Sequence, residues 1–316
     1  MPPYKFTFER DPPLYMCGEK VVGTAELTLL KERSFEDIRI GFRGMATVRW
    51  VDTLTRFPKL YSAEETYMEI ETVVFQGGQL LPSTYKYEFD FRVPDVCPTT
   101  CTTDIGKIYY ELSLLLVYED KEMRKFTSEV MVLQTYNIEK LPNALLPVIR
   151  SDEIFFCCWP CAAGPIDVHL KSARAAYIPG NTIEFTIEMT NKSKRCKFRT
   201  HVTIYLMQVY KFTTYLPRRR QRYISYDLKS VKKGIIVRSG DMVVVDDQFD
   251  VPPLPPSTQG THIISIKYEL RLEMRISAVS QAVSDLVVPI IIGTAVEQSV
   301  SFHVLSISYF ARKSPE

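Results

Sequence analysis

Apolar side chains occupy every second position in several windows of the chain, and polar side chains fill the positions between them. The clearest windows are residues 85–93, 183–190 and 264–274. A strand needs this period of two when one face packs on a core and the other meets water. No window of similar length repeats its apolar residues every 3.6 positions, as an amphipathic helix would. The pattern therefore predicts an all-β chain whose antiparallel strands pack as sandwiches.

Two parts of the chain repeat one another in the same order. Residues 93–100 recur at 251–258, and residues 108–114 recur at 266–272, both displaced by 158 positions. Nearer the start of each half, the Tyr-x-x-Gly segment of residues 15–18 recurs with a displacement of 162. Ordered matches of this kind indicate two copies of one structural unit, here one β-sandwich written twice.

The repeat sets the expected domain boundaries within the 316 residues. We expect a first sandwich over residues 1–143, a linker over 144–160 and a second sandwich over 161–316. The proline-rich parts of the repeat are expected to connect strands, because proline lacks the N–H that a central strand needs.

The charge balance and the absence of catalytic motifs narrow the function. Lys and Arg number 39 and Asp and Glu 37, which gives a formal net charge of +2. This excludes a globally basic nucleic-acid binder and an acidic tail protein. The four histidines stand singly, and the chain has no nucleophile-elbow, zinc-protease or phosphate-loop motif. We therefore expect no enzyme, no cofactor and no nucleic-acid partner.

The ends and the apolar stretches of the chain bear on its compartment. The first residues lack the apolar core of a signal peptide. The longest apolar stretch, residues 286–296, is interrupted by Pro289 and Gly293 and is shorter than the ~20 residues of a membrane span. We expect a cytoplasmic protein, peripheral at most to the plasma membrane or endosomes, whose cysteines are thiols.

The most specific motif is Phe156–Ile166, which reads Phe-Cys-Cys-Trp-Pro-Cys-Ala-Ala-Gly-Pro-Ile. It resembles the stretch Cys-Cys-Trp-x-Cys-x-x-Gly-Pro-Ile that opens the second domain of the arrestin domain-containing proteins (α-arrestins). Other marks similar to that family cover nearly the whole chain: Gly44–Trp50, Tyr177–Gly180, Asn191–Ser193, Pro252–Ser257, Ile263–Leu270 and Pro289–Thr294.

The resemblance implies two tandem immunoglobulin-like, arrestin-like β-sandwiches joined by a short linker. It also implies a non-enzymatic adaptor that binds cytoplasmic parts of membrane proteins in endocytic or endosomal protein transport. In the family, a C-terminal tail with Pro-Pro-x-Tyr motifs recruits WW-domain ubiquitin ligases. This chain ends at Glu316, so we expect a short member that lacks the tail and, with it, that route to a ligase.

One Pro-Pro-x-Tyr motif lies near the start, at Pro12, Pro13 and Tyr15. A WW domain binds such a motif as an exposed polyproline segment with the tyrosine in a pocket. Tyr15 is also the repeat counterpart of Tyr177, and this favours the alternative that it enters an early strand. Both interpretations stand at this point.

Eight basic residues against one aspartate form the sharpest charge feature of the chain. A net charge of +7 falls between Leu216 and Arg238, which leaves −5 for the rest. Such a segment can bind anionic lipid headgroups or phosphorylated peptides, or it can be a solvated hairpin loop. The candidate residues are Arg218, Arg219, Arg220, Arg222, Lys229, Lys232 and Lys233.

A cysteine cluster at Cys157, Cys158 and Cys161 allows a second hypothesis, a thiol- or zinc-dependent regulatory sensor. The Cys-x-x-Cys spacing suits a redox pair only at a helix N-terminus, which the surroundings do not predict. A zinc site needs four ligands, and His169 is the fourth candidate. Lipidation of the cluster and plain burial of the thiols are the remaining alternatives.

Overall fold

The computed structural model describes residues 3–53, 56–158, 161–192, 198–276 and 282–294. In the first half the chain forms strands β1 (Tyr4–Phe8), β2 (Leu14–Met16), β3 (Lys20–Leu29), β4 (Arg33–Asp52), β5 (Lys59–Leu80), β6 (Ser83–Arg92), β7 (Cys101–Thr102), β8 (Gly106–Tyr118) and β9 (Met123–Leu133). A short 3-10 helix, η1 (Ile138–Lys140), follows.

The second half consists of strands as well: β10 (Val148–Cys158), β11 (Cys161–Ser172), β12 (Ala176–Tyr177), β13 (Thr182–Asn191), β14 (Phe198–Thr214), β15 (Arg220–Val237), β16 (Met242–Asp250), β17 (Ile264–Ile276) and β18 (Ala282–Ile292). None of the helical structure in the described residues could reach across a lipid bilayer.

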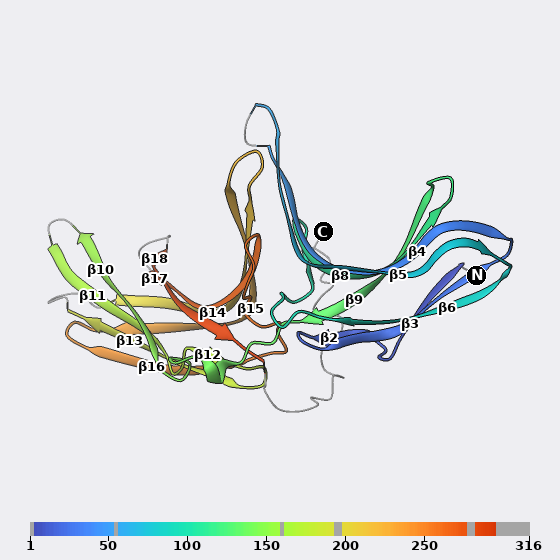
Figure 1. Ribbon diagram of the computed structural model, residues 1–316. Coiled ribbons are helices and arrows are strands. Elements are labelled where there is room, and N and C mark those ends of the chain that lie inside the picture. Colours follow the sequence, from blue (N-terminus) through green and yellow to red (C-terminus); the bar gives the residue numbers. More distant parts are fainter. Residues whose placement is uncertain (1–2, 54–55, 159–160, 193–197, 277–281, 295–316) are drawn as a thin grey trace.

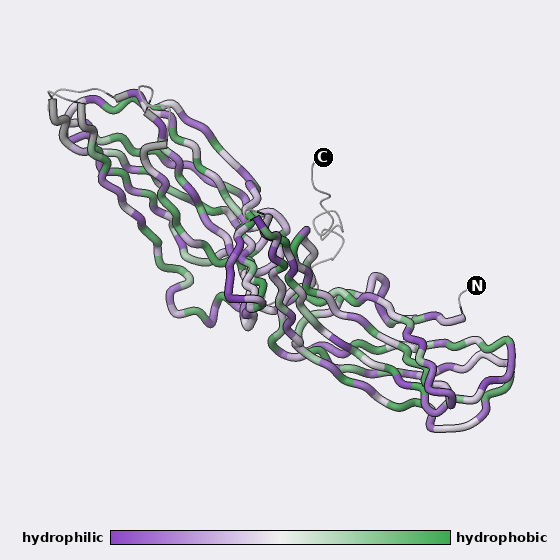
Figure 2. Tube along the Cα trace, turned by 90° about the horizontal axis from the view of Figure 1, so that it is seen from above, coloured by the Kyte–Doolittle hydropathy of each residue, from purple (hydrophilic) through white to green (hydrophobic). Residues whose placement is uncertain are grey.

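Each half packs two sheets face to face. In the first half, the sheet β1-β3-β6 lies against the sheet β2-β9-β8-β4-β5, to which β7 adds at β8. In the second half, the sheet β10-β11-β13-β16 lies against β12-β18-β17-β14-β15. Seen from above, the two sandwiches follow one another along an elongated molecule (Figure 2). The all-β prediction and the two tandem sandwiches are confirmed.

The period-two windows form strands whose apolar positions face the core. In β13, Ile183, Phe185, Ile187 and Met189 are all buried, and the residues between them are half-buried or exposed. The apolar set of β17 is buried in the same way. Removal of these two apolar faces from water stabilises the second sandwich by about 25 cal/mol per Å² of apolar surface.

The internal repeat has a structural counterpart in the order of the larger sheets. The order β2-β9-β8-β4-β5 matches β12-β18-β17-β14-β15 strand for strand. The short first strand of each carries the repeated tyrosine, Tyr15 or Tyr177, and pairs in parallel with its neighbour. In both sandwiches, the glycine three residues after this tyrosine donates its N–H to the carbonyl of the repeated valine. Gly18 donates to Val93, and Gly180 donates to Val251.

The segment expected as a linker contains a strand. Residues 148–158 form β10, which pairs antiparallel with β11 along most of its length and belongs to the second sandwich. The expected linker of residues 144–160 is therefore too long. Apolar and polar residues alternate only weakly in this segment, so the sequence pattern did not predict the strand. The reason is that β10 lies at the edge of its sheet, where exposed apolar residues such as Phe155 are tolerated.

Two long hairpins rise side by side near the middle of the molecule (Figure 1). One is formed by β4 and β5, whose pairing begins at Asp52 and Lys59 next to the turn. The other is formed by β14 and β15. Each hairpin projects beyond the body of its own sandwich (Figure 1). The first belongs to one domain and the second to the other.

Candidate functional surface at the domain junction

The tips of the two long hairpins join into one projection, which we define as residues 49–53, 56–62 and 213–223. Ser62 and Leu216 form an antiparallel bridge, in which the Ser62 N–H donates to the Leu216 carbonyl at 3.1 Å. The Tyr215 and Leu216 N–H groups donate back to the Ser62 carbonyl at 3.4 and 3.3 Å. The backbone of one domain thus pairs with that of the other within this hairpin projection.

Two of the predicted basic residues bind the first domain. Arg218 donates from Nε to the Tyr61 hydroxyl at 3.4 Å, and this contact lowers the pKa of Tyr61. Arg220 lies 3.6 Å from the Asp52 carboxylate and places its guanidinium 5.6 Å from the centre of the Tyr61 ring. Tyr61 is in turn stacked on Trp50. Arg218 and Arg220 are therefore interdomain contacts.

Two of the predicted lysines bind within the second sandwich instead. Lys233 forms an ion pair with Asp247 at 2.6 Å, and Lys229 lies 4.0 Å from Asp250, so both connect β15 to β16 in the opposite sheet. The hydrogen bond from Lys233 lowers the pKa of Asp247. These lysines therefore link the two sheets of the second sandwich and are not free to bind an anionic partner.

Three of the predicted basic residues remain on the outer surface. Within the part of the chain that the structure describes, Arg219, Arg222 and Lys232 form no ion pair. Arg222 and Lys232 are ten residues apart on one strand, roughly 33 Å at the usual rise. The seven candidates thus do not form a single patch, and the exposed arginines gather at the hairpin projection.

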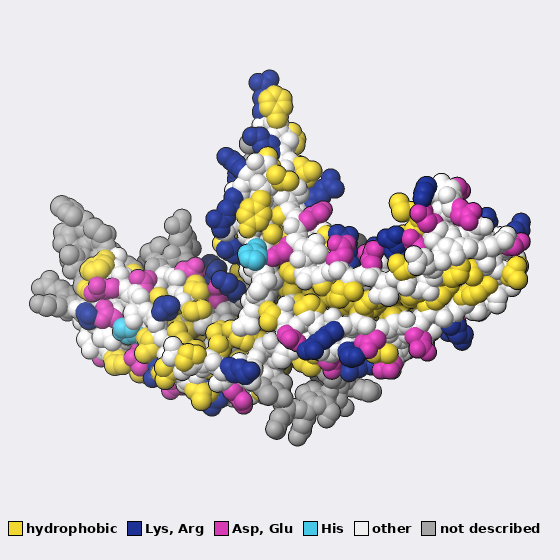
Figure 3. Space-filling view, in the orientation of Figure 1, with side chains coloured by type: hydrophobic (Ala, Val, Ile, Leu, Met, Phe, Trp, Pro, Cys, Tyr) yellow, Lys and Arg dark blue, Asp and Glu magenta, His cyan; other side chains and the backbone are white. Residues whose placement is uncertain are grey.

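The hairpin projection combines positive charge with exposed apolar side chains. Seven basic residues oppose the single carboxylate of Asp52 in its segments. Phe57 is 72% exposed and Leu216 66% exposed. Figure 3 shows basic and hydrophobic side chains together along the projection. A surface of this composition suits a partner that is anionic and partly apolar, such as the headgroup region of an acidic membrane.

A second polar contact between the domains lies beside the base of the projection. The Glu65 side chain is only 16% exposed and lies 2.5 Å from His262 Nδ1. It also accepts the backbone N–H groups of His262 and Ile263, at 3.1 and 3.4 Å. No sequence pattern predicts this contact, because the partners are separated by 197 residues.

Replacing Glu65 by glutamine is expected to lower the free energy of unfolding by about 1 kcal/mol, because neutral acceptors form weaker hydrogen bonds than carboxylates. Chemical denaturation measures the change. Glu64→Gln is the matched control, since Glu64 is the exposed neighbour on the same strand. An equal loss in both variants would contradict the role of the interdomain contact.

The Pro-Pro-x-Tyr motif near the start is part of the fold. Tyr15 lies in β2 and is 1% exposed, with Leu14 and Met16 paired to β9 on either side of it. A WW-domain groove cannot reach this ring while the sandwich is intact. Pro12 and Pro13 precede the strand without changing this conclusion.

The cysteine cluster spans the turn of the β10–β11 hairpin. Cys158 is paired with Cys161 in register, and Cys157 with Ala162, but the side chains of these cysteines lie outside the described residues. His169 is eight residues from Cys161 along β11, roughly 26 Å at the usual rise, and contacts Ser151 at 2.6 Å. It is therefore too far away to be the fourth zinc ligand, and the described residues contain no other cluster suited to a metal.

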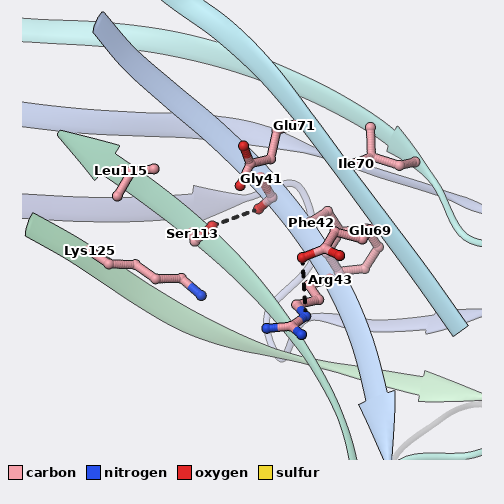
Figure 4. Close-up of a pocket in the computed structure, with 9 residues that line it drawn as sticks. All are labelled: Gly41, Phe42, Arg43, Glu69, Ile70, Glu71, Ser113, Leu115 and Lys125. Carbon is pink, nitrogen blue, oxygen red and sulfur yellow. Dashed lines mark hydrogen bonds and ion pairs between the residues drawn. The ribbon is translucent and has the colours of Figure 1, made fainter. Parts of the chain in front are cut away.

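A small cavity lies on the outer face of the larger sheet of the first sandwich (Figure 4). Its volume is about 180 Å³, below the ~300–1,000 Å³ of small-molecule sites. Arg43 and Glu69 point toward one another there at 3.3 Å, and Lys125 binds Glu111 at 2.7 Å. With these basic groups already paired, the cavity offers a small ligand little free charge.

Two family models match the chain: "Arrestin (or S-antigen), N-terminal domain" over residues 4–139, and "Arrestin (or S-antigen), C-terminal domain" over residues 162–296. Arrestin domain-containing protein 4 of Homo sapiens is 23% identical over 293 residues, covering 89% of this chain and 68% of the relative. Arrestin domain-containing protein 5 of Homo sapiens is 22% identical over 269 residues, covering 81% of this chain and 78% of the relative.

Proposed function

Because the chain belongs to the α-arrestin family of arrestin domain-containing proteins, we propose that it is a non-enzymatic adaptor for cytoplasmic parts of membrane proteins in endocytic or endosomal transport. The two sandwiches support this role, because they offer sheet edges and curved sheet faces to extended peptides. The proposal places the protein in the cytoplasm and, when it carries cargo, at the plasma membrane or endosomes.

The composition of the hairpin projection carries the proposal. The cytoplasmic leaflet is anionic and attracts basic side chains by about 1 kcal/mol each near its surface. Arg219 and Arg222 are exposed there, and neither forms an ion pair within the described residues. Phe57 and Leu216 add exposed apolar area at the same tips. The hairpin projection therefore faces the membrane in our proposal, and the sheet edges remain available for cargo.

Neutralising Arg219 and Arg222 together to glutamine is expected to weaken binding to phosphatidylserine vesicles by about 2 kcal/mol, roughly 30-fold. Co-sedimentation over a salt series measures the affinity, and the difference should shrink as salt screens the charges. Lys5→Gln with Lys31→Gln is the control, because it removes the same charge from exposed sites in the first domain.

If the lysine control pair weakened vesicle binding equally, the loss of affinity would be due to net charge alone and not to the position of the two arginines. Unchanged binding in the arginine pair would overturn the membrane-facing role of the projection. A loss of affinity for phosphorylated peptides without a loss for vesicles would assign the same surface to phosphorylated cargo instead.

Proximity labelling in cells tests the adaptor role itself. We expect enrichment of membrane proteins of the endocytic route around the wild-type chain and a smaller enrichment around the Arg219 and Arg222 variant. Labelling of soluble proteins alone would contradict the adaptor proposal. Ligase partners would appear in the same experiment, and the burial of Tyr15 means that they would not be bound through Pro12–Tyr15.

A further inference from the structure

Two cysteines of the first sandwich lie in contact, far from the cysteine cluster of the β10–β11 hairpin. Cys17 follows β2 directly, and Cys97 lies in the connection between β6 and β7. Their Sγ atoms are 3.0 Å apart, and both are free thiols. A disulfide has an S–S distance of about 2.05 Å, so a shift of roughly 1 Å would join them.

Backbone hydrogen bonds hold the two segments against one another. The Cys17 N–H donates to the Leu133 carbonyl at 3.2 Å. The next residue, Gly18, donates to the Val93 carbonyl at 3.2 Å, and the Val93 N–H donates to the Glu19 carbonyl at 2.9 Å. The thiols therefore face one another because of the fold, and the backbone need not rearrange to let them react.

The two thiols differ in accessibility and acidity. Cys17 is half-buried, whereas Cys97 is 2% exposed. Hydrogen bonding from the Cys97 thiol, and then from the Thr135 N–H, lowers the pKa of Cys17 despite its burial. The same thiol contact, together with burial, raises the pKa of Cys97. Cys17, the more exposed thiol and the one whose pKa is lowered, is therefore the one expected to react first, with Cys97 behind it.

The thiol pair is absent from the corresponding place in the second sandwich. The hydroxyls of Tyr110 and Tyr268 donate to the carbonyls of Pro98 and Pro255, respectively. These bonds align Pro98 with Pro255, so Cys97 corresponds to Leu254. The segment from the repeated valine to this proline is therefore one residue shorter in the second sandwich than in the first. The counterpart of Cys17 is Pro179. The fold therefore does not need sulfur at either position.

We propose that Cys17 and Cys97 are an oxidation site, which a peroxide converts into an intramolecular disulfide. The Cys17 thiolate attacks a peroxide oxygen, the O–O bond breaks, and after protonation one water leaves and Cys17 becomes a sulfenic acid. Cys97 sulfur then attacks Cys17 sulfur, the S–O bond breaks, and the hydroxide leaves with the Cys97 proton as a second water. Two thiols lose two electrons, and one peroxide gains them.

The disulfide would act close to the domain junction. Leu133, which binds the Cys17 backbone, is followed by Gln134, and the Gln134 side chain exchanges two hydrogen bonds of 3.0 Å with Gln259 of the second domain. The link would also close a loop between residues 17 and 97 and so restrict the unfolded chain. Oxidation is therefore expected to stiffen the first sandwich at its boundary with the second.

Peptide mapping of the full chain after hydrogen peroxide treatment tests the site. Trypsin places Cys17 in residues 11–20, and both Cys97 and Cys101 in residues 93–107. The Cys101→Ser variant therefore makes the assignment unambiguous. We expect a reducible cross-link between these two peptides in the wild type and in Cys101→Ser, and none in Cys17→Ser or Cys97→Ser.

Thermal unfolding provides an independent reading. The midpoint of the oxidised Cys101→Ser protein should rise on the order of 5–10 °C above the reduced form and return on reduction. The midpoint of Cys17→Ser should not respond to peroxide. Peptides that remain separate after treatment, a Cys17 that stops at a sulfinic acid, or a bond from Cys97 to Cys101 would each overturn the proposal.

Discussion

Replacing Gly293 by alanine is expected to lower the free energy of unfolding by about 1–3 kcal/mol. Gly293 follows β18, and its N–H donates to the Tyr177 carbonyl at 2.8 Å. A Cβ atom at this position would lie 2.2 Å from Ile138 Cγ2 and 2.7 Å from the Tyr136 carbonyl oxygen. Part of the obstacle is backbone, so a side-chain rotation alone cannot relieve it.

The strain would fall on the junction between the domains. Tyr136 and Thr294 exchange hydrogen bonds there, since the Tyr136 N–H donates to Thr294 Oγ1 at 2.9 Å and the Thr294 N–H donates to the Tyr136 carbonyl at 2.8 Å. Moving residues 136–138 away from a new methyl group would lengthen both bonds. We therefore expect a looser junction as well as a less stable chain.

Chemical denaturation and small-angle scattering measure the two effects of Gly293→Ala, with a larger radius of gyration expected for the variant. Gly234→Ala is the control, because the nearest atom to its added Cβ is 3.7 Å away, in ordinary contact distance. A Gly293→Ala protein as stable as the control would show that residues 136–138 yield without cost.

The sequence predicted those parts of the fold that depend on local pattern. Period-two windows marked β6, β13 and β17, because each of these strands buries one face and exposes the other. The period is broken in β4, which runs through 20 residues with bulges after Ile38 and Gly44. Each bulge shifts the buried positions by one, so the length of that strand could not be read from alternation.

The candidate site was harder to predict because its contacts are distant in sequence. The basic run allowed either an anion-binding segment or a solvated hairpin loop, but Arg218 and Arg220 bind Tyr61 and Asp52, more than 150 residues earlier. Only the packing of the two hairpins brings these groups together. The thiol pair illustrates the same limit, because Cys17 and Cys97 are 80 residues apart and share no spacing motif.

Gly293 and Tyr268 show how family-like motifs can encode packing. Both belong to segments that resemble the family, and each owes its place to a contact with another segment. Gly293 leaves room for the chain at residues 136–138, and Tyr268 binds the proline-rich connection at Pro255. The motif predicted the family, but the reason for each residue appears only in the structure.

Replacing Tyr268 by phenylalanine is expected to destabilise the second sandwich by about 3 kcal/mol, because two buried polar groups lose their partner at about 1–3 kcal/mol each. The Tyr268 hydroxyl donates to the Pro255 carbonyl at 2.7 Å and accepts from Gln208 Nε2 at 3.0 Å. In the first sandwich, the equivalent Tyr110 hydroxyl donates to Pro98 at 2.7 Å. Tyr110→Phe removes this bond and a weaker contact with the Cys97 thiol, and it leaves no buried amide without a partner, so it should cost less.

The Tyr268 hydroxyl should also affect how the stability of the chain changes at alkaline pH. Burial raises the pKa of Tyr268 well above its ordinary value, so the folded chain keeps this phenol neutral after the unfolded chain has ionised it. Its contribution to stability is complete below the unfolded pKa of about 10 and falls above it by about 1.4 kcal/mol per pH unit. Tyr268→Phe should remove that part of the slope.

Urea unfolding at pH 9, 10 and 11 tests the Tyr268 prediction, with Tyr223→Phe as the control because Tyr223 is 57% exposed. The control should keep the stability of the wild type at pH 9, whereas Tyr268→Phe should start lower and lose stability less steeply above pH 10. Parallel pH curves for Tyr268→Phe and the wild type would mean that this phenol ionises equally in the folded and unfolded chains. Its burial would then not be the cause of any alkaline instability.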